Sequence, residues 1–245
     1  MRLYGKNPVL ERIRTRPKTI KRLLLRQKTD LSEIVREAKS KKIDFESVDR
    51  NDFDKLCGDI NSQGVIAEVD EFEYADFNAI LPKCLKNGTI PVFLDNITDP
   101  QNLGSIIRNL ACLGGFAIIL PEYESAHVTE SVLRVACGGE NHMWIAKMTN
   151  IARGMEEAKE QGFHIIGTVA EPEADDITTV GIPYPVALVI GSEEKGIRPG
   201  LRKLLDTAVT IPMPGAKLSY NVSVATSLVC YELMRRKHIR KTNGE

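Results

Sequence analysis

The 245-residue sequence contains no apolar run near the length of about 18 residues that a membrane-spanning helix requires. Its clearest apolar runs, FAIIL and VALVI, cover only residues 116–120 and 186–190. The amino-terminal residues, MRLYGKNPVLERIRTR, lack the apolar stretch of a signal peptide. We therefore expect a cytosolic protein that does not enter a membrane.

Cysteine and histidine are also scarce. The five cysteines are scattered without a CxxC pair, and the four histidines form no HxxxH or HExxH pattern. Because zinc sites use such spacings, we expect no metal. An odd number of separated cysteines in a cytosolic chain indicates free thiols, which we expect to pack in the core.

Three well-known catalytic and nucleotide-binding loops are missing. The chain has no GxxxxGK[ST] segment, which argues against a P-loop NTPase. No GxGxxG follows a predicted strand, which argues against a Rossmann dinucleotide site or an ordinary Rossmann methyltransferase. No GxSxG is present, which argues against an α/β-hydrolase.

The balanced total charge conceals a strong segregation. Residues 1–42 carry fourteen basic and four acidic side chains, a net charge of +10, whereas residues 43–99 carry four basic and thirteen acidic ones, a net charge of −9. Such asymmetry indicates that the basic end meets a polyanion such as nucleic acid. A solvated basic face without a partner is the alternative that charge alone leaves open.

Periodicity predicts two α/β units. In residues 1–72, short strand patterns alternate with helical ones, and Asn7 followed by proline predicts a helix start with Asn7 as its N-cap. Acidic and turn-rich residues within 73–88 indicate a connection. From 89 to 245, apolar strands alternate with helices, which predicts a mostly parallel sheet with helices on both faces. The predicted strands cover residues 90–95, 116–120, 163–169, 186–190 and 208–213. The last predicted helix, over 221–239, has one apolar stripe, made of Val222, Ala225, Leu228, Val229 and Leu233.

Three polar loops follow strands of the second unit, over residues 94–109, 189–201 and 211–225. Ligands of open parallel sheets bind beyond the carboxyl ends of the strands, so these loops are candidates for a site. Arg108 suits a phosphate but equally an exposed ion pair. Glu193 suits an amine, a hydroxyl or a cation but equally a polar turn. Ser219 and Asn221, taken alone, are more typical of a helix cap.

Taken together, the loops resemble the three signature motifs of the SpoU (TrmH) family of RNA 2′-O-ribose methyltransferases. The matching segments are NITDPQNLGSIIR, LVIGSEEKGI and IPMPGAKLSYNVSVA. Upstream, YGKNPVLERI (4–13) and NSQGVIAEV (61–69) are similar to the substrate-binding module of the subgroup that methylates guanosine in large-subunit ribosomal RNA. The basic first unit agrees with such a module.

The resemblance implies a SPOUT-type parallel sheet with a deep trefoil knot, S-adenosylmethionine as the cofactor, RNA as the partner and a homodimer formed through the knot domain. It implies cofactor binding by Gly191, Ile211 and Tyr220. It implies catalytic roles for Arg108, Glu193, Asn221 and Ser219, with Glu193 and Asn221 orienting Arg108 or the nucleotide. It implies substrate binding by Asn102, Gln63 and Lys6.

Two residues depart from the family pattern. Tyr220 replaces the usual Leu of the third motif, and Ser62 replaces the usual His before Gln63-Gly64. The first departure changes a pocket wall, and the second concerns the particular RNA site. Three alternatives remain at this stage: a transfer-RNA ribose methyltransferase, a non-catalytic RNA-binding relic of the fold, and an unrelated small-molecule α/β enzyme.

Overall fold

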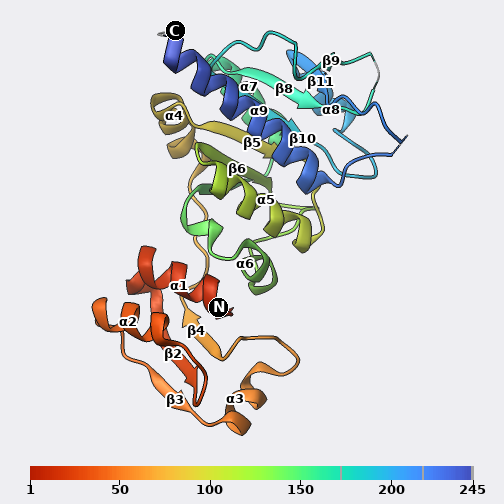
Figure 1. The fold of residues 1–245 in the computed structure, drawn as a ribbon. Coiled ribbons are helices and arrows are strands. Elements are labelled where there is room, and N and C mark those ends of the chain that lie inside the picture. Colours follow the sequence, from red (N-terminus) through yellow and green to blue (C-terminus); the bar gives the residue numbers. More distant parts are fainter. Residues whose placement is uncertain (172, 217, 244–245) are drawn as a thin grey trace.

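The structure is a computed structural model that describes residues 1–171, 173–216 and 218–243, with side chains up to residue 240. Lys217, which falls within the third motif, lies outside the described residues. Over those ranges the chain forms a four-stranded sheet near its amino terminus and a seven-stranded sheet after it. Figure 1 shows two units stacked end to end, with the amino terminus at the junction and the carboxyl terminus at the far end.

The smaller unit is a mixed sheet with helices against it. Its strand order is β1-β4-β2-β3, in which β4 pairs antiparallel with β1 and β2, and β2 pairs parallel with β3. The elements are β1 (Arg2–Tyr4), α1 (Lys6–Thr15), the 3-10 turn η1 (Pro17–Thr19), β2 (Ile20–Arg26), α2 (Ser32–Ser40), β3 (Glu46–Val48), α3 (Arg50–Cys57) and β4 (Val65–Val69).

Both faces of the smaller sheet are covered. Leu23 and Leu25 lie in the same core as α1 and α2, whereas Leu24, which points to the opposite face, packs with Phe53 of α3. The first helix begins earlier than we predicted, because Lys6 is already helical and Gly5 occupies the cap position with a φ of 95°. The prediction of Asn7 as the cap was therefore wrong.

The larger sheet is parallel throughout, with the order β7-β6-β5-β10-β8-β11-β9. Its strands are β5 (Ile90–Leu94), β6 (Phe116–Pro121), β7 (Trp144–Met148), β8 (His164–Thr168), β9 (Asp175–Asp176), β10 (Val186–Ile190) and β11 (Thr207–Thr210). Its helices are α4 (Phe77–Asn87), α5 (Pro100–Leu113), α6 (Glu130–Ala136), α7 (Ile151–Glu160), α8 (Pro199–Arg202) and α9 (Val222–Asn243), with a 3-10 turn η2 (Gly139–Asn141) after α6.

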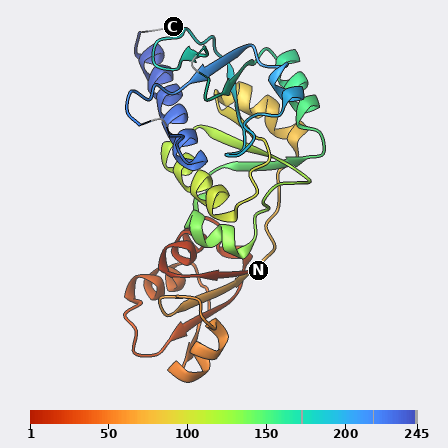
Figure 2. The same ribbon diagram turned by 90° about the vertical axis from the view of Figure 1, so that its right-hand side faces the viewer.

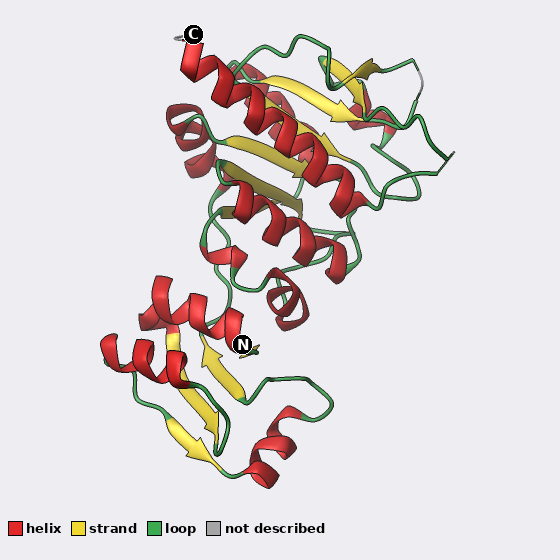
Figure 3. Cartoon of the chain, viewed as in Figure 1, coloured by secondary structure: helices red, strands yellow, loops and turns green. Residues whose placement is uncertain are grey.

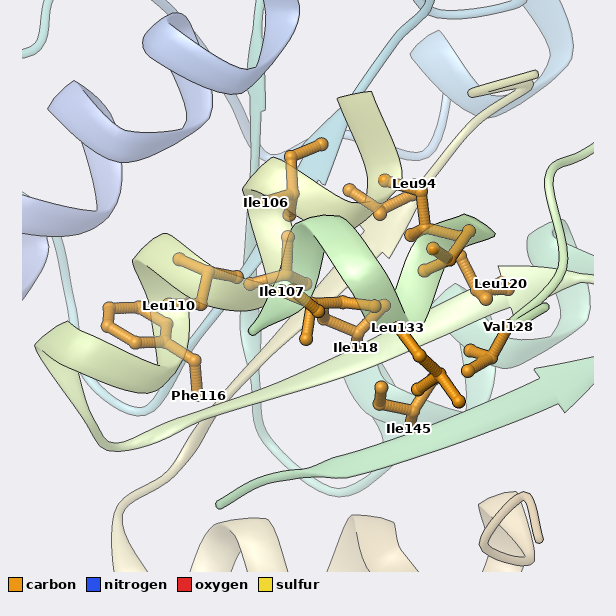
Figure 4. Close-up of a cluster of buried hydrophobic side chains, with 14 of the residues drawn as sticks. Leu94, Ile106, Ile107, Leu110, Phe116, Ile118, Leu120, Val128, Leu133 and Ile145 are labelled. Carbon is orange, nitrogen blue, oxygen red and sulfur yellow. The ribbon is translucent and has the colours of Figure 1, made fainter. Parts of the chain in front are cut away.

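Helices cover both faces of this sheet, as the alternation predicted. The strands β5 and β10 are buried along their full length, which requires a layer on each side. Figures 1 and 3 show α5 and α9 on one side of the sheet. Val92 and Leu94 belong to the core on that side, and Phe93 belongs to the core that contains residues of α4 and α7. In Figure 4, Phe116 and Ile118 of β6 lie beside Leu110 and Ile107 of α5.

Helix α4 lies within the segment that we predicted as a connection between the units. Its buried residues, Phe77, Ile80, Leu81 and Cys84, belong to the core of the larger sheet. Asp76 caps it by accepting a hydrogen bond from the backbone N–H of Asn78. Figure 2 shows the chain rising from the smaller unit beside the larger one before it enters this helix.

The apolar stripe predicted on the last helix serves mainly the chain's own core. Val222, Val229 and Leu233 of α9 are buried. Leu228 instead lies on another face with Val224 and Tyr231, and these three side chains are 41%, 44% and 54% exposed. In the part of the chain that the structure describes, no helix combines the length and the apolar character needed to cross a bilayer.

The cysteines are free thiols, but two of the five are not buried. Cys57, Cys84 and Cys230 lie in the core, whereas Cys112 is exposed and Cys137 is half-buried. Burial raises the pKa of the Cys84 thiol to about 12 and also raises that of Cys230. These two buried thiols are therefore neutral packing groups at physiological pH.

Candidate active site

The three polar loops predicted from the sequence meet at one edge of the larger sheet. Two of them follow the adjacent strands β5 and β10, and the third leads from β11 into α9. Because all these strands are parallel, their carboxyl ends share that edge. The meeting point is therefore a consequence of the strand order.

An ion pair between a buried carboxylate and an exposed arginine joins the first loop to the second. Asp95 is completely buried, and its carboxylate accepts hydrogen bonds from Nε of Arg198 at 2.7 Å and from the backbone N–H of Arg198 at 2.8 Å. We did not predict this pair. The only signal for Asp95 in the sequence is its place directly after a buried strand, and nothing there names its partner 103 residues later.

One residue from each motif joins a single hydrogen-bonded cluster. Oε1 of Glu193 accepts hydrogen bonds from Nδ2 of Asn102 at 3.2 Å and from Nδ2 of Asn221 at 2.8 Å. Asn221 also donates to Oδ1 of Asn102 at 3.0 Å. The backbone N–H of Val222 is the third donor to Glu193, at 3.2 Å. These contacts fix the three loops relative to one another.

Asn221 has a second role as the cap of α9. Its Oδ1 accepts hydrogen bonds from the backbone N–H and the hydroxyl of Ser223, at 2.9 and 2.6 Å. Asn102, in contrast, does not cap its helix: α5 begins at Pro100, and Asp99 accepts the capping hydrogen bond from Gln101. Asn102 is thus freed to bond across the loops.

A cavity of about 350 Å³ lies beside the cluster. The four predicted residues Gly191, Ile211, Ser219 and Tyr220 all line it, and Glu193 does too. Gly191 is obligatory there, because a Cβ atom would come within 2.1 Å of the carbonyl carbon of Gly196. Tyr220, the departure from the family pattern, contributes to the wall with a side chain that is 45% exposed.

The cavity also has charged and apolar walls. Arg202 donates hydrogen bonds to the carboxylate of Glu171, and this contact lowers the pKa of Glu171 and raises that of Arg202. Both side chains line the cavity. The apolar part includes Ile190, Ile197 and Val222. The walls therefore combine apolar side chains with charged and polar groups, as small-molecule sites usually do.

Arg108 lies away from this cluster within one chain. It is exposed on α5, and its Nη1 contacts Sγ of Cys137 at 3.7 Å. Arg108 follows Asn102 by six residues. At about 100° per residue, the two side chains lie about 120° apart around the helix axis. We predicted that Glu193 and Asn221 orient either Arg108 or the nucleotide. Within one chain both residues bond Asn102 and not Arg108.

Gly104, on the Arg108 side of α5, allows close packing of α6, since a Cβ there would meet Cβ of Val135 at 2.6 Å.

Lys6 and Gln63 adjoin each other in the smaller unit. Oε1 of Gln63 accepts a hydrogen bond from the backbone N–H of Lys6 at 2.8 Å, and Nζ of Lys6 donates to the carbonyl of Asp30 at 2.9 Å. Ser62 is buried, and its hydroxyl oxygen accepts from Sγ of Cys57 at 3.2 Å. Ser62, which departs from the family pattern, thus anchors the turn that carries Gln63 to the core of the smaller unit.

Comparison with known proteins agrees with the geometry. The sequence profile of the SpoU rRNA methylase family matches residues 89–231, and a profile described as RNA 2′-O ribose methyltransferase substrate binding matches residues 2–75. The chain is 33% identical over 240 residues to a Bacillus subtilis protein named as a TrmH family tRNA/rRNA methyltransferase, with 96% of each chain covered. A Staphylococcus saprophyticus protein with the same family name is 34% identical, again over 96% of each chain.

Solved structures share the fold. The SpoU methyltransferase AviRb from Streptomyces viridochromogenes, crystallised with the cofactor AdoMet, superposes with a TM-score of 0.78 at 22% identity, covering 97% of this chain and 90% of that one. An AdoMet-bound rRNA methyltransferase from Sinorhizobium meliloti gives a TM-score of 0.77 at 23% identity, covering 96% and 87%. On the profile match and the sequence identity together, the chain belongs to the SpoU rRNA methylase family.

Proposed function

We propose that this chain transfers a methyl group from S-adenosylmethionine to a ribose 2′-hydroxyl in RNA, and that its substrate is a guanosine of large-subunit ribosomal RNA. The observation that carries the proposal is the cluster of Asn102, Glu193 and Asn221, which joins all three motifs beside a cavity. The substrate-binding profile over residues 2–75 and the tRNA/rRNA names of the relatives support RNA as the substrate.

The cavity fits the cofactor in size and in chemistry. Its volume of about 350 Å³ falls within the range of about 300–1,000 Å³ that is usual for small-molecule sites. Gly191, Ile211 and Tyr220 would hold the cofactor, with apolar side chains such as Ile197 against its flat group. When bound, S-adenosylmethionine supplies an electrophilic methyl group on a sulfonium.

The chain's own residues would position the ribose and manage its charge. The methyl group offers no charge to hold, so alignment of the attacking oxygen matters most. Ser219 lines the cavity and can form a hydrogen bond with the ribose. The hydrogen bond between Glu193 and Asn221 holds the loop after β10 against the loop before α9. Arg108 would hold an RNA phosphate and stabilise the oxygen as it becomes anionic. A guanidinium offers donors and no acceptor, so Arg108 suits holding a negative charge rather than taking up a proton.

We further propose that two copies associate through the exposed face of α9. Val224, Leu228 and Tyr231 are spaced i, i+4, i+7, so they form one apolar stripe on the surface. Arg108 borders this region, because its neighbour Asn109 on α5 donates a hydrogen bond to Ser227 of α9 at 2.8 Å.

Location in the cytosol stays a prediction from the sequence, as does the trefoil knot.

Methylation of defined RNAs tests the proposal. The purified chain with radiolabelled S-adenosylmethionine should methylate large-subunit ribosomal RNA, and mapping of 2′-O-methyl groups in a strain that lacks the protein should show one lost guanosine position. Transfer of the label to transfer RNA alone would overturn the ribosomal assignment. Binding of RNA without any transfer would favour a non-catalytic relic of the fold.

A further inference from the structure

Residues 137–142, here called the bridge segment, lie directly against Arg108. A Cβ atom at Gly139 would come within 3.1 Å of Cα of Arg108 and within 3.2 Å of Cβ of Ala111, so the segment packs closely on α5. Cys137 receives the contact from Nη1 of Arg108. The bridge segment therefore meets both the backbone and the side chain of the proposed catalytic arginine.

The other side of the bridge segment meets the smaller unit. Nη2 of Arg12 on α1 donates to Oε1 of Glu140 at 3.1 Å, and the two side chains are only 4% and 1% exposed. A Cβ at Gly138 would come within 2.5 Å of Cβ of Glu11, and Nε2 of His142 lies 2.9 Å from Oε2 of Glu11. The two units thus contact each other closely through this segment, beside a second contact in which the backbone N–H of Arg2 in β1 donates to Oε1 of Glu130 in α6 at 2.6 Å.

The buried pair is poorly suited to a purely stabilising role. Nε of Arg12 and Oε2 of Glu140 find no hydrogen-bond partner among the described residues, although Nη1 of Arg12 reaches Thr19 at 3.4 Å and Asn141 donates to Oε1 of Glu140 at 2.9 Å. An incompletely bonded buried pair loses in desolvation much of what it gains in attraction, and an apolar pair of similar volume is often as stable. A charged pair adds specificity, because Arg12 and Glu140 are satisfied only when the smaller unit and the bridge segment have one relative orientation.

We propose that Arg12 and Glu140 are positioning residues for methyl transfer. The pair holds the RNA-binding unit in one orientation on the bridge segment, so that RNA bound there presents its ribose at a fixed place relative to Arg108. Both side chains are buried at the junction, so they would act through the segments they hold rather than by touching RNA or cofactor. This inference rests on the proposed function. A displacement of about 1 Å at a reacting centre can cost about 100-fold in rate, so a loosened junction would affect turnover before affinity.

The full-length Glu140→Gln variant tests this directly. We expect its single-turnover rate at saturating RNA to fall at least about tenfold, with the dissociation constants for RNA and S-adenosylmethionine within about twofold of the parent. The distance distribution between spin labels on Arg50 of α3 and Glu156 of α7, attached through non-canonical amino acids, should broaden. Glu157→Gln is the matched control, because it removes the same charge from an exposed pair with Arg153.

The double variant Arg12→Met/Glu140→Leu separates positioning from stability. We expect it to unfold at or above the parent's temperature while its rate stays low and its distance distribution stays broad. A double variant as fast as the parent, or a Glu140→Gln variant with the parent's rate, would overturn the proposal. If the parent methylates no RNA, the proposed function itself fails, whereas the label distances still report how the units dock because they need no substrate.

Discussion

Asn221 donates a hydrogen bond from Nδ2 to Oε1 of Glu193 at 2.8 Å, and the same oxygen accepts from the N–H of Val222 at 3.2 Å. Glu193 therefore places a carboxylate at the start of α9 from a different loop. A negative charge at a helix amino terminus is favourable, because the first N–H groups lack partners within the helix. One side chain thus links the loop after β10 to helix α9, whose first turn lines the cavity.

Removal of this carboxylate should loosen the site. In Glu193→Ala, the amides of Asn102 and Asn221 and the N–H of Val222 all lose their acceptor. We expect a loss of about 1–3 kcal/mol in the free energy of unfolding and at least tenfold weaker binding of S-adenosylmethionine. Glu193→Gln, which keeps an acceptor oxygen, should lose less. Chemical denaturation and calorimetry measure both quantities, with Glu156→Ala on the exposed side of α7 as the control.

Parent-like affinity in Glu193→Ala would show that the cofactor site does not depend on the link between these loops. Equal losses in the alanine and glutamine variants would show that the charge, rather than the acceptor oxygen, holds the loops.

RNA affinity should depend on the basic rim of the smaller unit. Lys18, Lys41 and Lys42 are exposed and line a surface pocket beside Arg22. Each Lys that neutralises a phosphate adds about 0.7–0.9 to the slope of log affinity against log salt. We therefore expect the triple glutamine variant to bind RNA more weakly and with a slope shallower by about two units. Filter binding between low and high salt measures this.

Substitution is a cleaner test than deletion of residues 1–70, because deletion would strip Arg12 from the buried Glu140. An unchanged salt slope in the triple variant would indicate that this rim is a solvated face.

The three polar loops could be predicted because each is one continuous segment of sequence. The hydrogen bonds and ion pairs between the loops could not be predicted. Apolar runs and turn residues marked β5, β6, β8 and β10, since strand burial leaves a continuous local signature. The strand β1 was missed because three residues carry little pattern, and β7 was missed because its partly exposed residues, Lys147 among them, interrupt the apolar run. Helix α4 was missed because Pro82 and the turn-like residues around it argue locally against a helix, while burial against the larger sheet overrides them.

Contacts between distant residues had no sequence signal. The Asp95–Arg198 pair spans 103 residues, and the Arg12–Glu140 pair spans 128. The chain has 33 basic and 33 acidic side chains, and the tertiary fold, not their spacing in the sequence, decides which of them pair. The position of Arg108 is a similar case: motif membership suggested a place beside Glu193, but the helical turn carries it to another side of α5.

The exposed stripe on α9 should control association. A lysine at Leu228, between Val224 and Tyr231, would place a charge in the middle of an apolar contact, which desolvation strongly disfavours. We expect the parent to be a dimer in light scattering at micromolar concentration and Leu228→Lys to be a folded monomer. Lysine at the exposed Tyr123, in the loop after β6, is the matched control. A monomeric parent would refute the proposed dimer, and a dimeric Leu228→Lys would refute this interface.

Arg108→Ala should abolish methyl transfer while folding and cofactor affinity stay nearly unchanged. The side chain is exposed on α5 and does not line the cavity, so its loss leaves no buried group unpaired. Its charge is needed mainly when the 2′-oxygen becomes anionic, so the rate should suffer far more than binding. Loss of one oxyanion-stabilising donor typically costs about 100- to 1,000-fold in rate. Arg108→Lys should recover little, because an ammonium lacks the bidentate fork. Single-turnover methylation with saturating RNA measures this, and a rate within about threefold of the parent would make Arg108 an ordinary surface residue.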